Sequence, residues 1–190
     1  YDSCRLLAIN LFSYVEEPFT KQAFFNFELF KKHIAVGQRI MDDIIDLELE
    51  KIDAIIKKIE ADPESEEVKL TERNLWINIR NKAKEGRRTG IGITAEGDML
   101  AALGIQYGSK KGNDFSTKVH KTIAIEAYRA SVHTAKERGA FTIFDSEREK
   151  DNPFIQRLKQ ADEKLYYEML EYGRGNIAVL TIAPTGTTSL

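Results

Sequence analysis

Two short stretches of this sequence hold side chains that could do chemistry. The first contains Cys4, the only cysteine, which stands just before an apolar run. A thiol in that place is either a small core residue or a reactive group, because free cysteine is among the most buried residue types and its thiolate is a nucleophile. The residues alone leave both interpretations open.

The second stretch is a turn rich in hydroxyl groups. It consists of Pro184, Thr185, Gly186, Thr187, Thr188 and Ser189, and it follows the apolar run IAVLTIA. Backbone N–H groups and hydroxyls at the carboxyl end of a strand suit a phosphate, above all where a helix begins. An ordinary turn with a capping serine has the same composition, so this alternative also stays open.

Other polar groups are interpreted as structural. His33, His120 and His133 occupy unrelated positions on helical patterns, without the cysteine or carboxylate spacing of a metal site, so we expect no metal. Arg87 and Arg88 follow the end of a predicted helix. The helix dipole favours cations there, and we prefer this explanation to an anion-binding role.

Composition limits the class of protein. With 190 residues, 42% of them hydrophobic, the chain can bury one ordinary core, so residues 1–190 are expected to form a single unit. The net charge of -2 gives no bulk electrostatic reason to expect a nucleic-acid polymer or an anionic membrane as partner. No apolar run approaches the roughly 20 residues of a membrane-spanning helix. A single cysteine suits a reducing cytoplasm.

Hydrophobic spacing predicts a helix-rich chain with three strands. We expect strands at residues 5–14, 89–95 and 177–183, and helices at residues 21–62, 71–85, 98–103, 115–138 and 152–170. Thr20 is the expected N-cap of the first helical stretch, which forms one long helix or two abutting ones. Residues 63–69 are interpreted as a solvated loop, and the charges between residues 42 and 60 as a solvated helix face.

Apolar strands separated by long helical segments suit a parallel sheet buried on both faces, since parallel pairing requires crossover connections. The glycines of residues 89–95 would allow close approach of another backbone segment. We therefore predict a helix-rich α/β unit whose sheet is incomplete within these residues.

Four stretches, in order along the chain, resemble the catalytic α subunit of ribonucleotide reductase. They are residues 3–11 (SCRLLAINL), 37–46 (GQRIMDDIID), 87–109 (RRTGIGITAEGDMLAALGIQYGS) and 180–189 (LTIAPTGTTS). The Ser-Cys-Arg-Leu-Leu and Pro-Thr-Gly-Thr-Thr forms are most similar to the adenosylcobalamin-dependent class II. The resemblance implies an internal, central-to-C-terminal part of the family's ten-stranded α/β barrel.

The resemblance also implies a reaction, the radical removal of the ribose 2′-hydroxyl from a ribonucleoside di- or triphosphate to give deoxyribonucleotides for DNA synthesis. Cys4 would be one of two redox-active cysteines that reduce the substrate and become a disulfide, with its partner outside this chain. The turn at residues 184–189 would hold the substrate phosphates. Adenosylcobalamin, an external dithiol such as a thioredoxin-like reductant, and the rest of the reductase chain are the implied cofactor and partners.

Two departures from the family pattern limit what is carried over. Residues 94–98 read TAEGD where the family has Gly-x-Ala-Asp, so the family's contacts are not assigned to that loop. The Asn-Pro-Cys-x-Glu loop with the thiyl-forming cysteine is not in the chain, and we expect this piece to be inactive alone. An incomplete barrel exposes strand edges, so self-association, a homodimer included, is also expected.

One alternative comes from a different class, a non-catalytic helical protein-interaction module in which Cys4 is core and the last turn is a cap. The reading frame around this segment separates the two hypotheses. An upstream Asn-Pro-Cys-x-Glu sequence would exclude the module.

Overall fold

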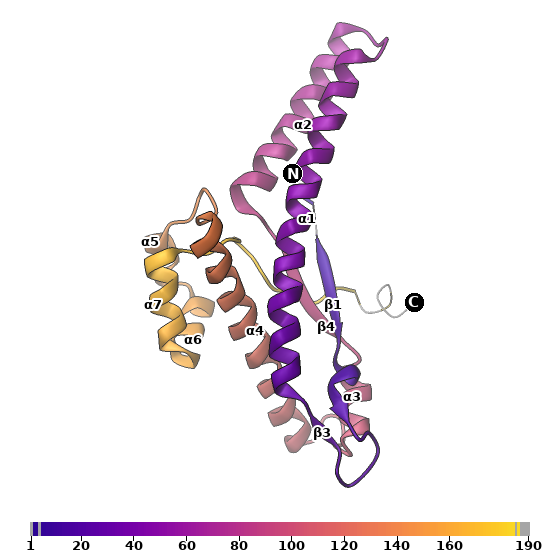
Figure 1. Ribbon diagram of the computed structural model, residues 1–190, viewed down its shortest axis with the longest axis vertical. Helices are drawn as coiled ribbons and strands as arrows, with labels where there is room; N and C mark the ends of the chain where they lie inside the picture. The colour runs from indigo at the N-terminus through magenta and orange to yellow at the C-terminus, as the bar shows by residue number, and fades with distance from the viewer. Residues whose placement is uncertain (1, 4, 185, 187–190) are drawn as a thin grey trace.

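The computed structural model describes residues 2–3, 5–184 and 186, and most of these residues are helical (Figure 1). The elements are β1 (Leu6–Asn10), a 3-10 helix (Leu11–Tyr14), β2 (Val15–Glu16), β3 (Phe24–Phe25), α1 (Phe27–Ala61), α2 (Glu66–Gly86), β4 (Gly90–Thr94), α3 (Glu96–Ala102), α4 (Lys110–Arg138), α5 (Ser146–Glu149), α6 (Pro153–Ala161) and α7 (Glu163–Tyr172). No helix of the described residues is long and apolar enough to cross a membrane.

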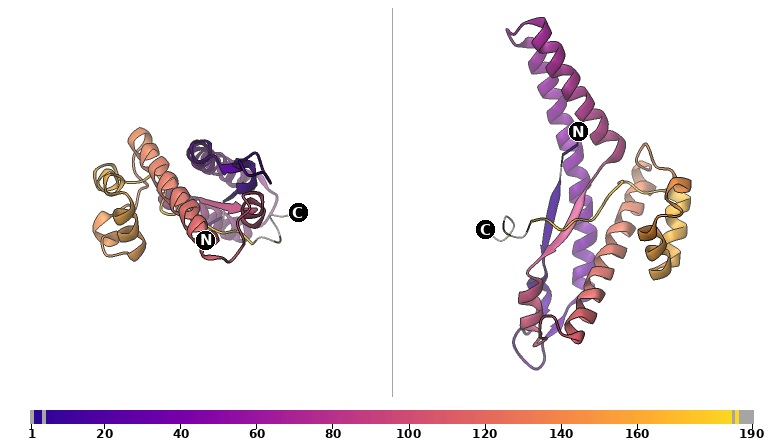
Figure 2. Two further views of the ribbon diagram at one scale, coloured as in Figure 1. Left: turned by 90° about the horizontal axis from the view of Figure 1, so that it is seen from below. Right: turned by 180° about the vertical axis from the view of Figure 1, so that it is seen from behind.

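The sheet is short and parallel. β1 pairs with β4 from Leu6↔Gly90 to Asn10↔Thr94. The predicted third strand, residues 177–183, contributes one parallel bridge, Ile91↔Leu180, in place of a full strand. These residues, called the C-terminal segment below, cross the sheet on the side away from α1 (Figure 2).

Burial on both faces, expected from the apolar runs, is wrong for β1. Leu7 lies against the surface of α1 at Gly37, whereas Leu6 on the other face is 43% exposed. The C-terminal segment bridges to β4, whose Gly90 and Gly92 are buried, whereas Leu6, Ala8 and Asn10 of β1 are exposed.

The first long helix starts later than Thr20. Thr20 donates its hydroxyl hydrogen to the carbonyl oxygen of Glu17 in a turn, and the chain then forms β3 against β2. Asn26 is the N-cap, since its Oδ1 accepts from the N–H of Leu29 at 3.0 Å. From there α1 runs as one helix to Ala61, in agreement with an end just before Pro63.

The second helix departs from the prediction at both ends. Residues 66–69, expected in a loop, are helical because Ser65 caps the first turn. At the other end Gly86 is still helical and Arg87 takes the left-handed conformation, with φ of 44°. A non-glycine residue there is strained, so other contacts of Arg87 must hold it. With α1 this helix forms a hairpin that projects beyond the sheet (Figure 1).

The predicted last helix, residues 152–170, is two helices. Asp162 ends α6 and caps α7, because its Oδ1 accepts from the N–H of Leu165 at 2.9 Å, while Oδ2 binds Arg129 Nη2 at 2.6 Å. The predicted helix at residues 115–138 begins earlier, at Lys110, and ends before Gly139 as expected.

The core joins α1, α4 and the sheet. Its fully buried apolar members include Leu11, Phe30, Ile34, Met41, Ile91, Met99, Val119 and Leu165. Because α1 packs on both α4 and the two strands, it is the element around which the others are arranged.

The glycines of β4 allow the close approach that the sequence predicts. A Cβ at Gly92 would lie 2.2 Å from the carbonyl oxygen of Thr181. We expect Gly92→Ala to lower the free energy of unfolding by about 1–3 kcal/mol, because backbone must move to relieve this clash. Gly97→Ala is the control, since its Cβ would meet no atom within 4 Å. Chemical denaturation measures both, and equal stability of the two variants would contradict the close approach.

The cap of α7 predicts a pH effect. Burial raises the pKa of Asp162, but the Leu165 N–H and Arg129 outweigh burial, so the pKa is lowered. The carboxylate therefore stabilises the fold above the unfolded pKa of about 3.9, and this contribution disappears as the pH falls through the lower folded value.

We expect Asp162→Asn, which keeps a capping oxygen, to lose about 0.5 kcal/mol at neutral pH and nothing at low pH. Asp162→Ala should lose about 1–2 kcal/mol at neutral pH. Denaturant titrations at several pH values measure this, with Asp151→Asn at an exposed position as control. If the difference in free energy of unfolding between wild type and Asp162→Asn stays constant with pH, this would argue against the ion pair.

Candidate functional site

Parallel segments end at one edge of the sheet, which is where ligands bind in α/β folds. β1 and β4 end side by side at Asn10↔Thr94, and the C-terminal segment runs in the same direction through its bridge to β4. The predicted phosphate turn begins directly after this segment. The described residues thus bring the chain from its bridge at Leu180 to Pro184, where the predicted turn begins.

Most of the predicted site residues lie outside the described part of the chain. These are Cys4, Thr185, Thr187, Thr188 and Ser189. Pro184 and Gly186 are described. The roles assigned to the thiol and to the turn therefore stay predictions.

The residues on either side of Cys4 are held by one carboxylate of α1. Ser3 Oγ donates to the two oxygens of Glu48 at 2.7 and 3.0 Å, and Arg5 Nε donates to the same carboxylate. Arg5 is buried, and its Nη1 donates to the carbonyl oxygen of Arg88 at 2.9 Å. The neighbours of Cys4 are therefore anchored to α1 and to the chain that enters β4.

Behind the sheet, the carboxylate of Asp42 is 0% exposed and binds three side chains. Its Oδ1 accepts from Arg87 Nε at 2.9 Å and from Asn176 Nδ2 at 2.8 Å, and its Oδ2 accepts from Arg138 Nη1 at 3.0 Å. The expectation that the charges between residues 42 and 60 all face solvent is wrong for Asp42. Its burial is compensated by two guanidinium groups and an amide.

Asp42 belongs to a larger ion-pair group, called the Asp42 cluster. Oxygens of Asp42, Asp43 and Asp46 lie within 4.8 Å of one another. Arg87 Nη1 donates to Asp46 at 2.7 Å, and Arg138 Nη2 donates to Asp43 at 2.8 Å. The positive charge among these carboxylates is thus supplied by two arginines, and the cluster ties α1 to α4 and to the end of α2.

The cluster explains the conformation of Arg87. Burial lowers the pKa of its guanidinium. The hydrogen bonds that it donates to the carboxylates of Asp42 and Asp46 outweigh burial and raise the pKa above its usual range. Arg87 also donates from Nη2 to the carbonyl oxygen of Asp42 at 2.9 Å. These contacts hold the left-handed backbone, and they add to the helix-dipole explanation that the sequence favoured.

Asn176 is fully buried beside the Asp42 cluster and joins three parts of the fold. Its Nδ2 donates to Asp42 and, at 2.9 Å, to the carbonyl oxygen of Arg87. Its Oδ1 accepts from Gln38 Nε2 at 2.9 Å and from Ser131 Oγ at 2.8 Å. Both donors and both acceptor positions of the amide are used.

Arg174, two residues before Asn176, is 1% exposed and also holds this part of the chain in place. Its guanidinium binds both oxygens of Glu149 at 2.5 and 2.8 Å. It also lies within 5.4 to 5.6 Å of the ring centres of Tyr128, Phe141 and Phe144. A bidentate carboxylate and aromatic faces are the surroundings that a buried guanidinium needs.

The three histidines have separate partners. The partners are Tyr14 for His33 at 3.1 Å, Glu96 for His120 at 3.6 Å and Glu137 for His133 at 3.1 Å. Among the described residues no histidine belongs to a group of potential metal ligands.

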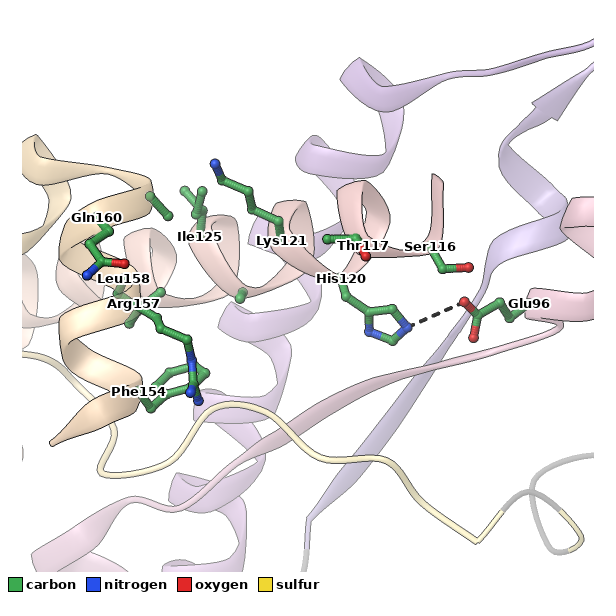
Figure 3. A pocket seen from close by; sticks show the side chains of 12 residues that line it. Glu96, Ser116, Thr117, His120, Lys121, Ile125, Phe154, Arg157, Leu158 and Gln160 are labelled. Atoms are coloured by element: carbon green, nitrogen blue, oxygen red, sulfur yellow. Dashed lines mark ion pairs between the residues drawn. The ribbon is translucent and has the colours of Figure 1, made fainter. Parts of the chain in front are cut away.

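A cavity of about 620 Å³ lies between α4 and α6 (Figure 3). His120 faces Glu96 across one end, and Arg157 lies over the ring of Phe154 at the other, 5.8 Å from its centre. A neighbouring cavity shares His120 and Phe154 and reaches the C-terminal segment at residues 180–182. The wall mixes both charges with apolar carbon, which does not define a ligand class.

Sequence reasoning missed the buried polar residues. Arg174 stands between Gly173 and Gly175, and Asn176 stands between Gly175 and the apolar run. Polar residues alternating with glycines at this place were the available signal. A polar side chain that enters a buried segment must find partners, although the sequence does not say which.

The pair of Arg174 and Glu149 predicts a large loss of stability. Glu149→Gln would leave the guanidinium buried without its counter-charge, and we expect a loss of about 2–3 kcal/mol. A fully buried pair would lose more, but Glu149 keeps 25% of its side chain exposed. The matched control is Glu147→Gln on the same helix, whose partner Lys150 is exposed. Similar thermal unfolding of the two variants would contradict this assignment.

Comparison with known proteins adds the family. The family model described as "Ribonucleotide reductase, barrel domain" matches residues 1–190. The chain is 28% identical over 191 residues to a vitamin B12-dependent ribonucleoside-diphosphate reductase of Mycobacterium tuberculosis, a match that covers all of this chain and 20% of that protein.

Two further relatives are also ribonucleoside-diphosphate reductases. A vitamin B12-dependent ribonucleoside-diphosphate reductase of Thermoplasma acidophilum is 29% identical, with all of this chain and 19% of that protein covered. A ribonucleoside-diphosphate reductase subunit alpha of Chlamydia pneumoniae is 25% identical over 98% of this chain and 17% of that protein. The chain thus spans about a fifth of the length of the relatives it matches.

Proposed function

This chain belongs to the ribonucleotide reductase barrel-domain family, and from that premise we propose that it is part of the catalytic subunit of a cobalamin-dependent ribonucleoside-diphosphate reductase. The observation that carries the proposal is the match over the whole chain, both to the family model and to relatives named as vitamin B12-dependent. Because those relatives are diphosphate reductases, a diphosphate is the proposed substrate. The activity is assigned to the longer protein, and this piece alone is proposed to be inactive.

The proposed reaction balances with a dithiol as reductant. The ribose 2′-hydroxyl leaves as water, a hydrogen replaces it on carbon 2′, and two thiols lose two hydrogens and join as a disulfide. Cys4 is proposed to be one of these thiols, with its partner elsewhere in the reductase. An external dithiol then reduces the disulfide by thiol–disulfide exchange, which requires a thiolate accessible to it.

The proposed role of the turn at residues 184–189 is to bind the substrate phosphates. Its place directly after a parallel segment supports this role, since the carboxyl edge of an α/β sheet is where ligands bind. Backbone N–H groups in a glycine-containing turn can approach phosphate oxygens closely. Ser3 and Arg5, the residues before and after Cys4 in the sequence, are both anchored to Glu48.

Cobalamin does not fit the described residues. The cavity beside α4, about 620 Å³, is in the range of about 300–1,000 Å³ typical of sites for drug-sized molecules, and adenosylcobalamin is far larger. We therefore assign the cofactor, which supplies the radical in this class, to other parts of the reductase chain. A reducing cytoplasm is the proposed location, since it keeps a catalytic thiol reduced.

The alternative of a helical interaction module has no observation in its favour. The family match covers residues 1–190, including the two stretches that a module would use only for packing.

The proposal predicts activity that depends on Cys4. We expect the full-length reductase to convert a ribonucleoside diphosphate to its deoxy form when adenosylcobalamin and dithiothreitol are present, and to prefer the diphosphate to the triphosphate. Cys4→Ser should reduce product formation to background, because a hydroxyl cannot form the disulfide. Chromatographic measurement of deoxyribonucleotide checks this.

Ser13→Ala is the control, since it removes an exposed hydroxyl nearby in the sequence and leaves Cys4 and its neighbours Ser3 and Arg5 unchanged. It should keep most of the activity. A full-length protein without activity would argue against the reductase, whereas full activity of Cys4→Ser would argue only against the role of the thiol.

A further inference from the structure

We infer that Asn176 is a positioning residue that fixes the register of the C-terminal segment on β4, and thereby the place where the chain leaves the sheet at Pro184. The inference rests on the proposed function, in which the turn that begins there binds phosphate. It assigns a role in substrate binding to a buried side chain far along the segment from the turn.

The segment itself specifies its register weakly. Its sequence, IAVLTIA, is apolar except for Thr181, so a shift along β4 would not exchange a buried face for a polar one. Four backbone hydrogen bonds hold it beside β4 and the residues just before that strand. In two of them Ile91 donates to the carbonyl oxygen of Val179 at 2.8 Å and Thr181 donates to that of Ile91 at 3.0 Å. Backbone bonds of this kind can form again after a shift, so side-chain contacts must select one register.

Asn176 can select it because its bonds are specific in direction. The two groups that face Nδ2, the Asp42 carboxylate and the Arg87 carbonyl, are acceptors only, while Gln38 and Ser131 donate to Oδ1. A shift by one residue would put a glycine or an isoleucine at this place and leave several buried polar groups without partners.

Helix α4 also fixes the backbone beside Asn176. Asn176 donates its N–H to Ser131 Oγ at 3.1 Å, and Gly175 donates to the carbonyl oxygen of Ser131 at 2.8 Å. A Cβ at Gly175 would lie 2.9 Å from Thr134, so a residue with a side chain does not fit there. The Gly-Asn pair is therefore matched to one site on α4.

The register has a consequence at the other end of the segment. Thr181 lies over the two glycines of β4, where a Cβ at Gly90 or Gly92 would meet it at 2.7 or 2.2 Å. In this register the smallest residues of the strand face the crossing backbone, and Pro184 follows three positions later. Displacing the segment would displace the turn.

The experiment compares binding of cytidine diphosphate and of cytidine to the full-length reductase. Both share the nucleoside, so the ratio of their dissociation constants isolates the contribution of the phosphates. The ratio is the dissociation constant of cytidine divided by that of cytidine diphosphate. For Asn176→Ala we expect this ratio to fall by about 10-fold or more, because a misplaced turn loses phosphate contacts while the nucleoside contacts remain. Equilibrium dialysis measures both constants.

Two further variants keep the test decisive. Ser131→Ala removes one hydroxyl that binds Asn176 and keeps the rest of the network, so it should show a smaller fall in the same direction even if Asn176→Ala does not fold. Asn78→Ala, at an exposed position on α2, is the matched control and should leave the ratio unchanged.

Two outcomes would overturn the inference and are distinguishable. If the wild-type enzyme binds both ligands equally, the phosphate-binding turn itself is wrong, and the inference falls with it. If the wild type prefers the diphosphate but folded Ser131→Ala and Asn176→Ala keep the wild-type ratio, or weaken both ligands equally, Asn176 is only structural.

Discussion

A buried carboxylate needs hydrogen-bond donors in place of the water that it loses. The carboxylate of Asp42 accepts hydrogen bonds from donors in distant parts of the chain. The donors come from the end of α2, from the end of α4 and from the stretch that follows α7. Each of these elements meets α1 at the same point. The long helix thus serves as the common support for the sheet and for the segment that crosses it, and the apolar core fills the remaining space.

Polar and apolar contacts have different functions in this arrangement. Apolar burial favours compactness but is non-directional, so it tolerates small shifts of one element along another. The amide of Asn176 and the guanidinium of Arg174 are directional, and both stand at the entrance of an apolar segment. Together they hold the start of the C-terminal segment in one place beside β4.

Local features of the fold could be predicted from the sequence, because they depend on neighbouring residues. Pro63 ends α1, Gly139 ends α4, and the glycines of β4 admit a crossing backbone. Features that depend on distant partners could not. The partners Asp42 and Asn176 are 134 positions apart, so neither the inward direction of the carboxylate nor the anchoring of the segment follows from local pattern.

The same holds for the candidate site. Its motifs could be recognised from residue types at Cys4 and at residues 184–189, whereas the contacts that place their neighbours, such as those of Glu48, required the fold. Asp162 is a similar case, because its role as a cap depends on Arg129 from another helix as well as on Leu165.

The pairing of β1 with β4 has a consequence for how the chain acquires its structure. Both long helices, α1 and α2, lie between the two strands in the sequence. During synthesis β1 therefore leaves the ribosome well before its partner, while the helical hairpin can form from contacts close in sequence. The hairpin brings the two ends of this long loop together, so that β1 and β4 can pair although the residues of two helices separate them.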